Sequence, residues 1–380
     1  MRGNVMSKRV SIICVLVLAF GLSVLAAQTP ADKAENAGSG IGMKAFAALA
    51  PIDTHTHVAK GDPEFYAMLD RLNLHVLDIL LVDDTDPYRK DLTRERQDAE
   101  TVIAASQGHV SLCTSIDPFK FDDQDFSAAA IRGLNQDFAK GAIAVKIWKN
   151  IGMELKDKDG RYVLPDDPKF APIYRDIASH NRTLIAHLAE PDEAWEAPHP
   201  NGLDSGYYKR HPRWYMYNKP GVPAKQQILD ARDHILAQNP KLRVVGAHLG
   251  SMEDDLDGLG KRLDRYPNFA VDTAARVVHL AVMPSDRVRS FILKYQDRIV
   301  YGTDLGYSSQ APSGDTISGD TIKDWEEQYA RDWRYFATHD KFEYEGHPTR
   351  GLGLPLPVLH KLYHANAMHW FPGIIAKAAD

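Results

Sequence analysis

The chain has 380 residues, of which 44% are hydrophobic and 25% are charged, a composition typical of a globular protein that buries a large core. Its 45 lysines and arginines and 51 aspartates and glutamates give a formal net charge of −6. There is no long basic run, so nucleic acid and anionic membrane surfaces are disfavoured as the main partner, which leaves a small-molecule partner open.

The N-terminus has the features of a secretory signal peptide. Three basic residues precede an apolar run that ends at Leu25, and Ala26 and Ala27 provide the small residues of a cleavage site. We therefore expect residues 1–27 to be removed, residues 28–49 to form a linker, and the protein to be secreted or periplasmic without stable membrane insertion. An uncleaved membrane anchor is the alternative, because the apolar run is close to the lower length limit of a spanning helix.

Short apolar runs follow, several of them rich in valine and isoleucine, and the stretches between them are mostly amphipathic and long enough for a helix. Strands that alternate with helices imply parallel pairing through crossover connections. The architecture predicted is an α/β fold of the (β/α)8 TIM-barrel type, in one domain over residues 50–380. A doubly wound open sheet is disfavoured because no Gly-x-Gly-x-x-Gly turn follows an early strand. The expected strands are residues 50–58, 74–83, 109–117, 141–149, 182–190, 242–250, 268–276 and 298–306.

Two connections are too long for simple crossovers and are rich in aromatic residues. The first runs from Pro191 to Lys225 after the fifth strand, and the second runs from Tyr307 to Leu356 after the eighth strand. In a barrel both would leave the C-terminal face, where active sites are built from the loops that follow the strands. We expect them to form pocket walls or lids. The alternative is that their rings cap the barrel or meet a second subunit, as in a homodimer.

The motif PIDTHTHV places two histidines, His55 and His57, on the same face of the first strand, because side chains in a strand alternate with a period of two. Alone, the pair is weak evidence in a chain with 16 histidines. Three further candidate ligands stand at the ends of later strands, namely His187, His248 and Asp304. Since these strand ends share one rim of a barrel, the residues together predict a divalent metal site. Nitrogen and oxygen ligands suit Zn²⁺, with Mn²⁺, Fe²⁺ or Co²⁺ as alternatives.

Basic residues add a second feature to this rim. In the stretch AIAVKIWK, alternation places Lys146 inside the barrel, where a buried lysine requires a compensating charge. Lys146 could pair with a carboxylate, hold an anionic substrate or, once carboxylated by carbon dioxide, bridge two metal ions. Arg276, just past the seventh strand, is a candidate anchor for a substrate carboxylate, with a salt bridge at the rim as the alternative. The cluster Lys209, Arg210 and Arg213 is expected on a solvated face, with attraction of an anion as the alternative.

Taken together, these residues resemble the amidohydrolase superfamily of metal-dependent barrel hydrolases. The strands VVGAHLG, VDTAAR and YGTDLG and the late segment HANAMHWF are most similar to its amidohydrolase-related branch, which includes the aminocarboxymuconate semialdehyde decarboxylase-like enzymes. The resemblance covers residues 50–371. It implies that His55, His57 and His187 bind the metal, and that Asp304 both binds the metal and moves protons.

The resemblance also implies roles for the two remaining residues. His248 matches a ligand of the second metal in members with two metals, and a catalytic group in members with one. Lys146 matches the carboxylated lysine that bridges two metals, but related members carry a lysine here with a single metal, and we expect one ion rather than two.

The implied reaction is hydrolysis of a small ester, lactone or amide by metal-activated water. Asp304 would take the proton of the water, and His248 would steady the developing oxyanion. A carboxy-lyase that acts on a small carboxylic acid at the same site is the first alternative. The second alternative is a non-catalytic barrel that binds a small molecule.

Overall fold

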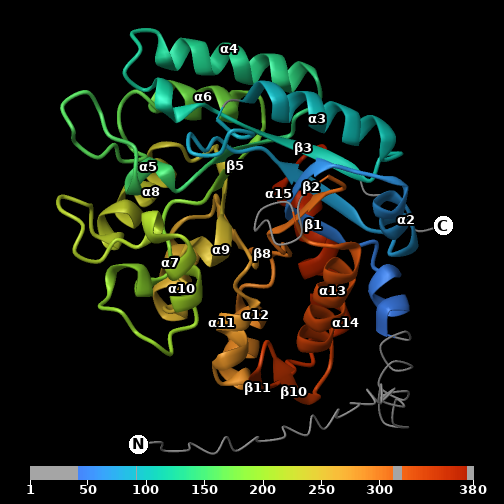
Figure 1. Ribbon diagram of the computed structural model, residues 1–380. Helices are drawn as coiled ribbons and strands as arrows, with labels where there is room; N and C mark the ends of the chain where they lie inside the picture. The colour runs from blue at the N-terminus through green and yellow to red at the C-terminus, as the bar shows by residue number, and fades with distance from the viewer. Residues whose placement is uncertain (1–41, 91, 311–318, 375–380) are drawn as a thin grey trace, which may run out of the picture. The chain divides into compact units, whose positions relative to one another are not determined.

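The structure is a computed structural model that describes residues 42–90, 92–310 and 319–374. Its main sheet is parallel, with the strand order β8-β7-β6-β5-β4-β3-β2-β1-β9 (Figure 1). The strands of this sheet are β1 (Ile52–Lys60), β2 (His75–Ile79), β3 (Val110–Ser115), β4 (Ala144–Ile147), β5 (Thr183–Ala186), β6 (Arg243–Gly246), β7 (Phe269–Asp272), β8 (Ile299–Val300) and β9 (Leu305–Ser308).

The sheet closes into a barrel through the segment that joins its two edge strands. β8 and β9 stand at opposite ends of the strand order, yet residues 301–304 alone separate them in the chain. Within this segment Tyr301 O accepts a hydrogen bond from Thr54 N at 3.0 Å, and Asp304 N donates to His55 O at 2.8 Å. The expected eighth strand is therefore interrupted, with its first half on β7 and its second half on β1. The (β/α)8 TIM barrel predicted from the sequence is confirmed.

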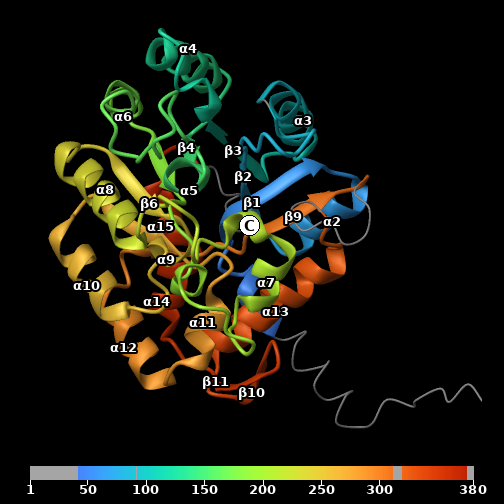
Figure 2. The same cartoon turned by 60° about the vertical axis from the view of Figure 1, so that its left-hand side comes forward.

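Helices alternate with the strands and lie around the outside of the barrel (Figures 1 and 2). The α-helices are α2 (Pro63–Arg71), α3 (Leu92–Ala105), α4 (Phe126–Ala139), α5 (Asn150–Met153), α6 (Ala171–Ser179), α7 (Ser205–Arg210), α8 (Lys225–Gln238), α9 (Ala247–Gly250), α10 (Leu256–Arg265), α11 (Val277–Val282), α12 (Ser285–Lys294), α13 (Ile322–Ala337), α14 (Leu356–His360) and α15 (Asn366–Trp370). Shorter elements are η1 (Pro118–Lys120), η2 (Asp192–Trp195), η3 (Pro212–Trp214), the π-helical η4 (Lys361–Ala365) and a hairpin of β10 (Lys341–Tyr344) and β11 (His347–Arg350).

Helix α2 illustrates how local sequence specifies these elements. Asp62 caps the helix by accepting a hydrogen bond from Phe65 N at 2.9 Å, and a proline occupies its first turn, where no backbone donor is required. Phe65, Met68 and Leu69 follow at helical spacing and are fully buried. The opposite face is polar, so the helix lies with one side on the barrel.

The interior of the barrel is divided into an apolar layer and a polar layer above it. Strands β2 to β8 each contribute a buried side chain to the apolar layer, which also contains Trp370 and Phe371 from the C-terminal segment. Two positions further along three of these strands stand Lys146, His187 and Asp272, which are also buried. Since strand residues two apart face the same side, the apolar filling supports a ring of polar groups at the C-terminal ends of the strands. The strand residues of the apolar layer include Leu77, Cys113, Ala144, Ile185, Val245, Ala270 and Val300.

The packed fold begins before the expected start of the barrel domain. Phe46 is fully buried, and its ring lies 5.7 Å from that of Tyr329, 5.9 Å from that of Trp333 and 5.3 Å from that of Tyr363. The last residues of the expected linker therefore pack against the barrel domain, and the boundary at residue 49 stays a prediction. The expected signal peptide and the first part of the linker lie outside the described residues. In the described part of the chain, no helix combines the length and the apolar character that crossing a membrane requires.

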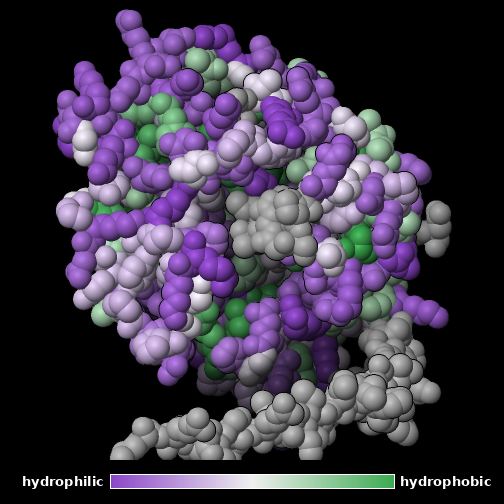
Figure 3. All heavy atoms as spheres, in the orientation of Figure 1, coloured by the Kyte–Doolittle hydropathy of each residue, from purple (hydrophilic) through white to green (hydrophobic). Residues whose placement is uncertain are grey.

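The two long connections differ in whether their aromatic residues line the pocket described below. The first, after β5, contains η2, α7 and η3 and contributes side chains to the pocket described below. The second contains α13, whose aromatic side chains are buried, and none of the described aromatic residues of this connection lines that pocket. On the face seen in Figure 3, hydrophilic residues predominate and apolar residues show chiefly in recesses. The buried rings of α13 are Trp325, Tyr329, Trp333, Tyr335 and Phe336.

Candidate active site

Three buried histidines, two from β1 and one from α9, have the same ring nitrogen bound to a neighbouring oxygen. The Nδ1 atom of His57 lies 2.7 Å from Ile79 O, and that of His248 lies 2.9 Å from Ala274 O. A carbonyl oxygen accepts only, so Nδ1 carries the proton and Nε2 of a neutral ring has a free lone pair. Burial lowers the pKa of His57 to about 4 and the pKa of His248 well below its ordinary value, so both rings are neutral. His55 has Asp272 Oδ2 at 2.8 Å from its Nδ1 and is oriented in the same way.

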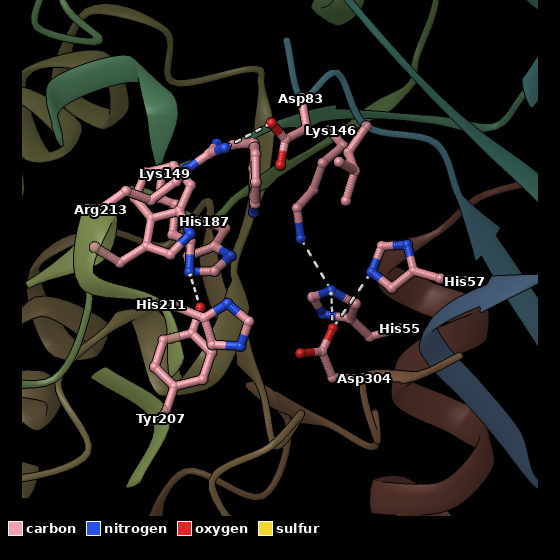
Figure 4. Close-up of a pocket in the computed structure, with 13 residues that line it drawn as sticks. His55, His57, Asp83, Lys146, Lys149, His187, Tyr207, His211, Arg213 and Asp304 are labelled. Carbon is pink, nitrogen blue, oxygen red and sulfur yellow. Dashed lines mark hydrogen bonds and ion pairs between the residues drawn. The ribbon is translucent and has the colours of Figure 1, made fainter. Parts of the chain in front are cut away.

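Asp304 brings these ring nitrogens together (Figure 4). Its Oδ1 lies 3.3 Å from His55 Nε2 and 3.3 Å from His57 Nε2. The residue lies between β8 and β9 with φ of 70°, a value uncommon for a residue with a Cβ, and this conformation is held by its backbone bond to β1. Burial acts to raise the pKa of Asp304, but the surrounding histidines lower it well below its ordinary value, so the carboxylate is ionised.

The five candidate ligands predicted from the sequence lie together. Among the described residues, His55, His248 and Asp304 each offer a ligand atom within 4.8 Å of the other two. His187 Nδ1 lies 3.1 Å from His248 Nε2, and the pKa of His187 is lowered by burial and by His248. Neutral imidazole nitrogens around one ionised carboxylate form the kind of donor set that binds a divalent cation such as Zn²⁺ or Mn²⁺. The residues therefore fit a divalent metal, and their individual roles as ligands remain predictions.

Lys146 faces this donor set from β4, as alternation along the strand predicts. The residue is 1% exposed, and its Nζ lies 2.9 Å from His55 Nε2 (Figure 4). Burial lowers the pKa of Lys146 to about 8, although Asp304 and Asp272 act to raise it. The amine thus shares the His55 lone pair that a metal would require, which is consistent with a role for Lys146 beside the metal or as a carboxylated bridge.

A pocket with a cavity volume of about 170 Å³ opens above these groups, and aromatic and basic side chains form its wall. The rings of Trp148 and Trp214 meet edge to face with 5.0 Å between their centroids. The Lys149 ammonium lies 4.5 Å from the Trp214 ring, and the Arg213 guanidinium lies 4.2 Å from it. The lining residues are His55, His57, Leu81, Asp83, Lys146, Trp148, Lys149, His187, Tyr207, His211, Arg213, Trp214 and Asp304.

Lys149 is a pocket residue that the sequence did not single out. Its side chain is 4% exposed, donates to Glu190 Oε1 and donates to Tyr207 Oη at 2.7 Å. Burial acts to lower the pKa of Lys149, but Glu190 and Tyr207 raise it above its ordinary value, so the ammonium persists in the pocket wall. Its partner Glu190 also lies 3.9 Å from His187 Nε2, which links the pocket wall to a candidate ligand.

Arg213 was expected on a solvated face, and this expectation is wrong. Arg213 Nη1 donates to Asp83 Oδ1 at 2.8 Å and Arg213 Nη2 donates to Glu154 Oε2 at 3.2 Å, and the residue lines the pocket. Asp83 follows β2 and Glu154 follows α5, so one guanidinium ties the connection after β5 to two other parts of the barrel rim. The connection is held in place as a wall of the pocket.

Arg276 lies outside the lining of the pocket. It is 7% exposed, with its Nε 3.5 Å from Glu253 Oε2 and its Nη2 3.9 Å from Glu190 Oε2. The alternative of a salt bridge, which the sequence left open, describes its surroundings better than contact with a substrate. Because Arg276 does not line the pocket, its role is to support the position of Glu190.

Another residue that the sequence analysis missed is Asp272, whose carboxylate contacts the backbone or side chain of two candidate ligands. Its signal was a charged residue directly after the apolar stretch FAV, since a buried carboxylate requires donors nearby. Asp83 carried a similar signal at the end of the expected second strand but was not singled out, whereas His211 comes from a connection whose path is set by packing.

With the barrel and its donor set described, the comparison with known proteins decides the family. The chain matches the model of the Amidohydrolase family over residues 52–373. The chain belongs to the amidohydrolase family. The match confirms the resemblance drawn from the sequence, and family and donor set together support a divalent metal. Among curated proteins, none matches this amidohydrolase.

Solved structures with a similar fold include two decarboxylases and a dihydroorotase. The 2,6-dihydroxybenzoate decarboxylase from Rhizobium shares 14% identity over 84% of this chain and 98% of its own, with a TM-score of 0.49. A dihydroxybenzoic acid decarboxylase from Polaromonas sp. JS666, with bound manganese and the inhibitor 2-nitroresorcinol, shares 12% identity over 84% and 96%, with a TM-score of 0.48. Dihydroorotase from Campylobacter jejuni shares 12% identity over 84% and 82%, with a TM-score of 0.45. Similarities this low do not decide the reaction of this chain.

Proposed function

We propose that this amidohydrolase is a metal-dependent carboxy-lyase that acts on a small, planar carboxylic acid. The observation that carries the proposal is the wall of the pocket, in which the Lys149 and Arg213 cations lie against the Trp214 ring. Cations recognise a carboxylate, and indole rings pack against a flat apolar body. The cavity of about 170 Å³ suits a single ring-sized molecule.

The wall of the pocket also distinguishes decarboxylation from hydrolysis. Loss of carbon dioxide spreads a charge that is localised on the bound carboxylate, and such a step is favoured where bulk water is excluded. Trp148 and Trp214 are buried side chains that exclude water from this side of the pocket. A pocket whose indole walls exclude water therefore favours decarboxylation over attack by a solvent molecule.

Different residues would bind the metal, orient the substrate and transfer the proton. His55, His57, His187 and Asp304 would hold the metal, which when bound supplies a positive centre for the oxygens of the substrate. Lys149 and Arg213 orient the acid group. When the bond to carbon dioxide breaks, its electron pair stays on the substrate carbon. Asp304 is ionised, so it would first take a proton from a water molecule and then pass it to that carbon.

Hydrolysis by metal-activated water is the second candidate, and Asp304 favours it. Its ionised carboxylate lies beside two ring nitrogens of the donor set, and 33% of its side chain is exposed. It could accept a proton from a water at this position, as a general base requires. The same residues would then open a small lactone, ester or amide.

The identity of the metal, its count, the export of the protein and its oligomeric state are parts of the same proposal. Three imidazoles and a carboxylate favour a single Zn²⁺, with Mn²⁺ as the alternative. The basic, apolar and small-residue pattern of residues 1–27 supports export. We also propose a homodimer, and the molecular mass of the purified protein in solution would test this.

The test joins metal content to product analysis. Purified protein is assayed for divalent metals, and then incubated with small aromatic and unsaturated carboxylic acids labelled in the carboxyl group, and in parallel with lactones, esters and amides. We expect about one metal equivalent and labelled carbon dioxide, both lost in the His57→Ala variant. Protein without stoichiometric metal under metal-replete conditions contradicts the metal site. Hydrolysis products without carbon dioxide replace the first candidate by the second.

A further inference from the structure

The carboxylate of Asp272, at the end of β7, contacts two candidate ligands that come from two other strands. Asp272 Oδ2 lies 2.8 Å from His55 Nδ1. Asp272 Oδ1 accepts hydrogen bonds from His248 N at 2.7 Å and from Ala274 N at 3.1 Å. The residue is 1% exposed, so solvent does not compete for these bonds.

The contact with His55 determines which ring nitrogen faces the site. A carboxylate that accepts from two backbone amides is an acceptor toward His55 as well, so His55 Nδ1 carries the proton. The lone pair of the ring is then on Nε2, the atom that lies 3.3 Å from Asp304 Oδ1. A histidine whose other nitrogen donates to a carboxylate is held in the orientation that metal binding requires.

The contact with His248 holds an unusual backbone. His248, Leu249, Gly250 and Ser251 have φ values of 58°, 54°, 63° and 57°, so four consecutive residues are left-handed, although only glycine adopts this conformation readily. The turn begins at His248, whose amide is bound by Asp272 and whose Nδ1 lies 2.9 Å from Ala274 O. Both anchors of His248 thus come from the short segment that starts at Asp272.

The far end of this turn is anchored independently of Asp272. Ser251 Oγ donates to Ala189 O at 2.6 Å, and Arg232 Nη1 donates to Gly250 O at 2.6 Å. These bonds hold Gly250 and Ser251 but leave the direction of the His248 ring to its own two anchors. Loss of the Asp272 contact is therefore expected to release the histidine rather than the whole turn.

We propose that Asp272 is a positioning residue that couples His55 and His248, so that one carboxylate sets the direction of both rings toward the metal. The proposal rests on the metal site proposed above and names a residue that supports it without binding the metal. Because one carboxylate serves both rings, an amide in its place cannot accept from His248 N and from His55 Nδ1 at the same time.

The test is Asp272→Asn, with Asp332→Asn as the matched control. In the variant, an amide oxygen that still accepts from His248 N turns its NH₂ group toward His55 Nδ1, and the two donors conflict. His55 can then relieve the conflict by moving its proton to Nε2, which removes the lone pair. We expect the affinity for added Co²⁺ or Zn²⁺ to fall roughly 10- to 100-fold, and the visible spectrum of the Co²⁺-loaded protein to change.

The control separates this effect from the loss of any buried carboxylate. Asp332 is fully buried and accepts hydrogen bonds from Tyr301, Gln328 and Tyr344, and none of these three residues is a candidate ligand. Asp332→Asn is expected to bind Co²⁺ with an affinity within about twofold of the wild type and with an unchanged spectrum. Circular dichroism of all three proteins shows whether the fold is retained.

The outcomes distinguish this inference from the proposed function. A wild-type protein that takes up no metal contradicts the metal site itself. A wild type that binds metal, beside an Asp272→Asn variant with the same affinity and spectrum, overturns only the coupling. If the variant does not fold, nitrogen NMR of the histidine rings in metal-free wild type decides, with His55 assigned by a His55→Gln variant. A proton on His55 Nδ1 supports the proposal, and a proton on Nε2 overturns it.

Discussion

The ion pair between Lys149 and Glu190 provides a quantitative test of the pocket, because its loss acts on stability and on substrate binding through separate routes. Both side chains are 4% exposed, and the ammonium also donates to Tyr207 Oη at 2.7 Å. Lys149→Met removes the cation and leaves the Glu190 carboxylate buried without its closest partner. Breaking a buried pair in this way costs about 3–5 kcal/mol of the free energy of unfolding.

The double variant Lys149→Met/Glu190→Gln removes the stranded charge as well. A buried pair replaced on both sides is close to neutral, so most of the lost stability is expected to return. The substrate contact does not return, because neither variant has the cation. A hydrogen bond to a charged group contributes about 1.5–3 kcal/mol, so kcat/KM toward a carboxylate substrate is expected to fall roughly 10- to 150-fold in both variants.

Urea unfolding and steady-state kinetics of the wild type and the two variants measure these quantities. The reasoning is refuted on the side of stability if Lys149→Met unfolds at the same urea concentration as the wild type. It is refuted on the side of function if the double variant recovers wild-type kcat/KM, since Lys149 would then act through the fold alone.

Three further outcomes follow from the structure. Asp304→Asn keeps the shape of the side chain but removes its charge, so kcat should fall by about 10²- to 10⁴-fold, and an active variant would exclude Asp304 as the proton carrier. Arg213→Gln breaks the bonds to Asp83 and Glu154, so limited proteolysis between residues 191 and 224 should become faster, whereas an unchanged cleavage rate would show that the connection is held by other contacts. Burial raises the pKa of Asp332 from 3.8 to about 6, so the folded protein binds more protons than the unfolded chain between these values. Its free energy of unfolding should therefore decrease by about 3 kcal/mol as the pH rises through that interval, and urea unfolding of Asp332→Asn across the interval should lack this contribution.

The fold and the donor set were predictable because both depend on short-range pattern. Alternation along a strand decides that His55 and His57 face the same side, and the end of a parallel strand places His187 and His248 at a common rim. Neither inference requires knowledge of packing. Asp304 was predictable for the same reason, although it lies at a break in its strand that the apolar run did not reveal.

The wall of the pocket depends on which distant groups become neighbours, and only the tertiary structure decides that. Lys149 is a pocket cation because Glu190, from the segment after β5, lies beside it. Arg213 lines the pocket because Asp83 and Glu154 bind its guanidinium. Arg276 lies outside the pocket because its guanidinium faces the Glu253 carboxylate.

The left-handed turn of residues 248–251 could not be predicted from its sequence HLGS either. Three of these four residues carry a Cβ and have no local preference for that conformation. It is held by the Asp272 carboxylate from the following strand and by the anchors of Gly250 and Ser251. The sequence alone therefore determined which candidate ligands lie at a common rim, because strand alternation is local. The direction of each ring and the charge of the pocket were decided by the tertiary structure, because ion pairs and hydrogen bonds join segments far apart in the chain.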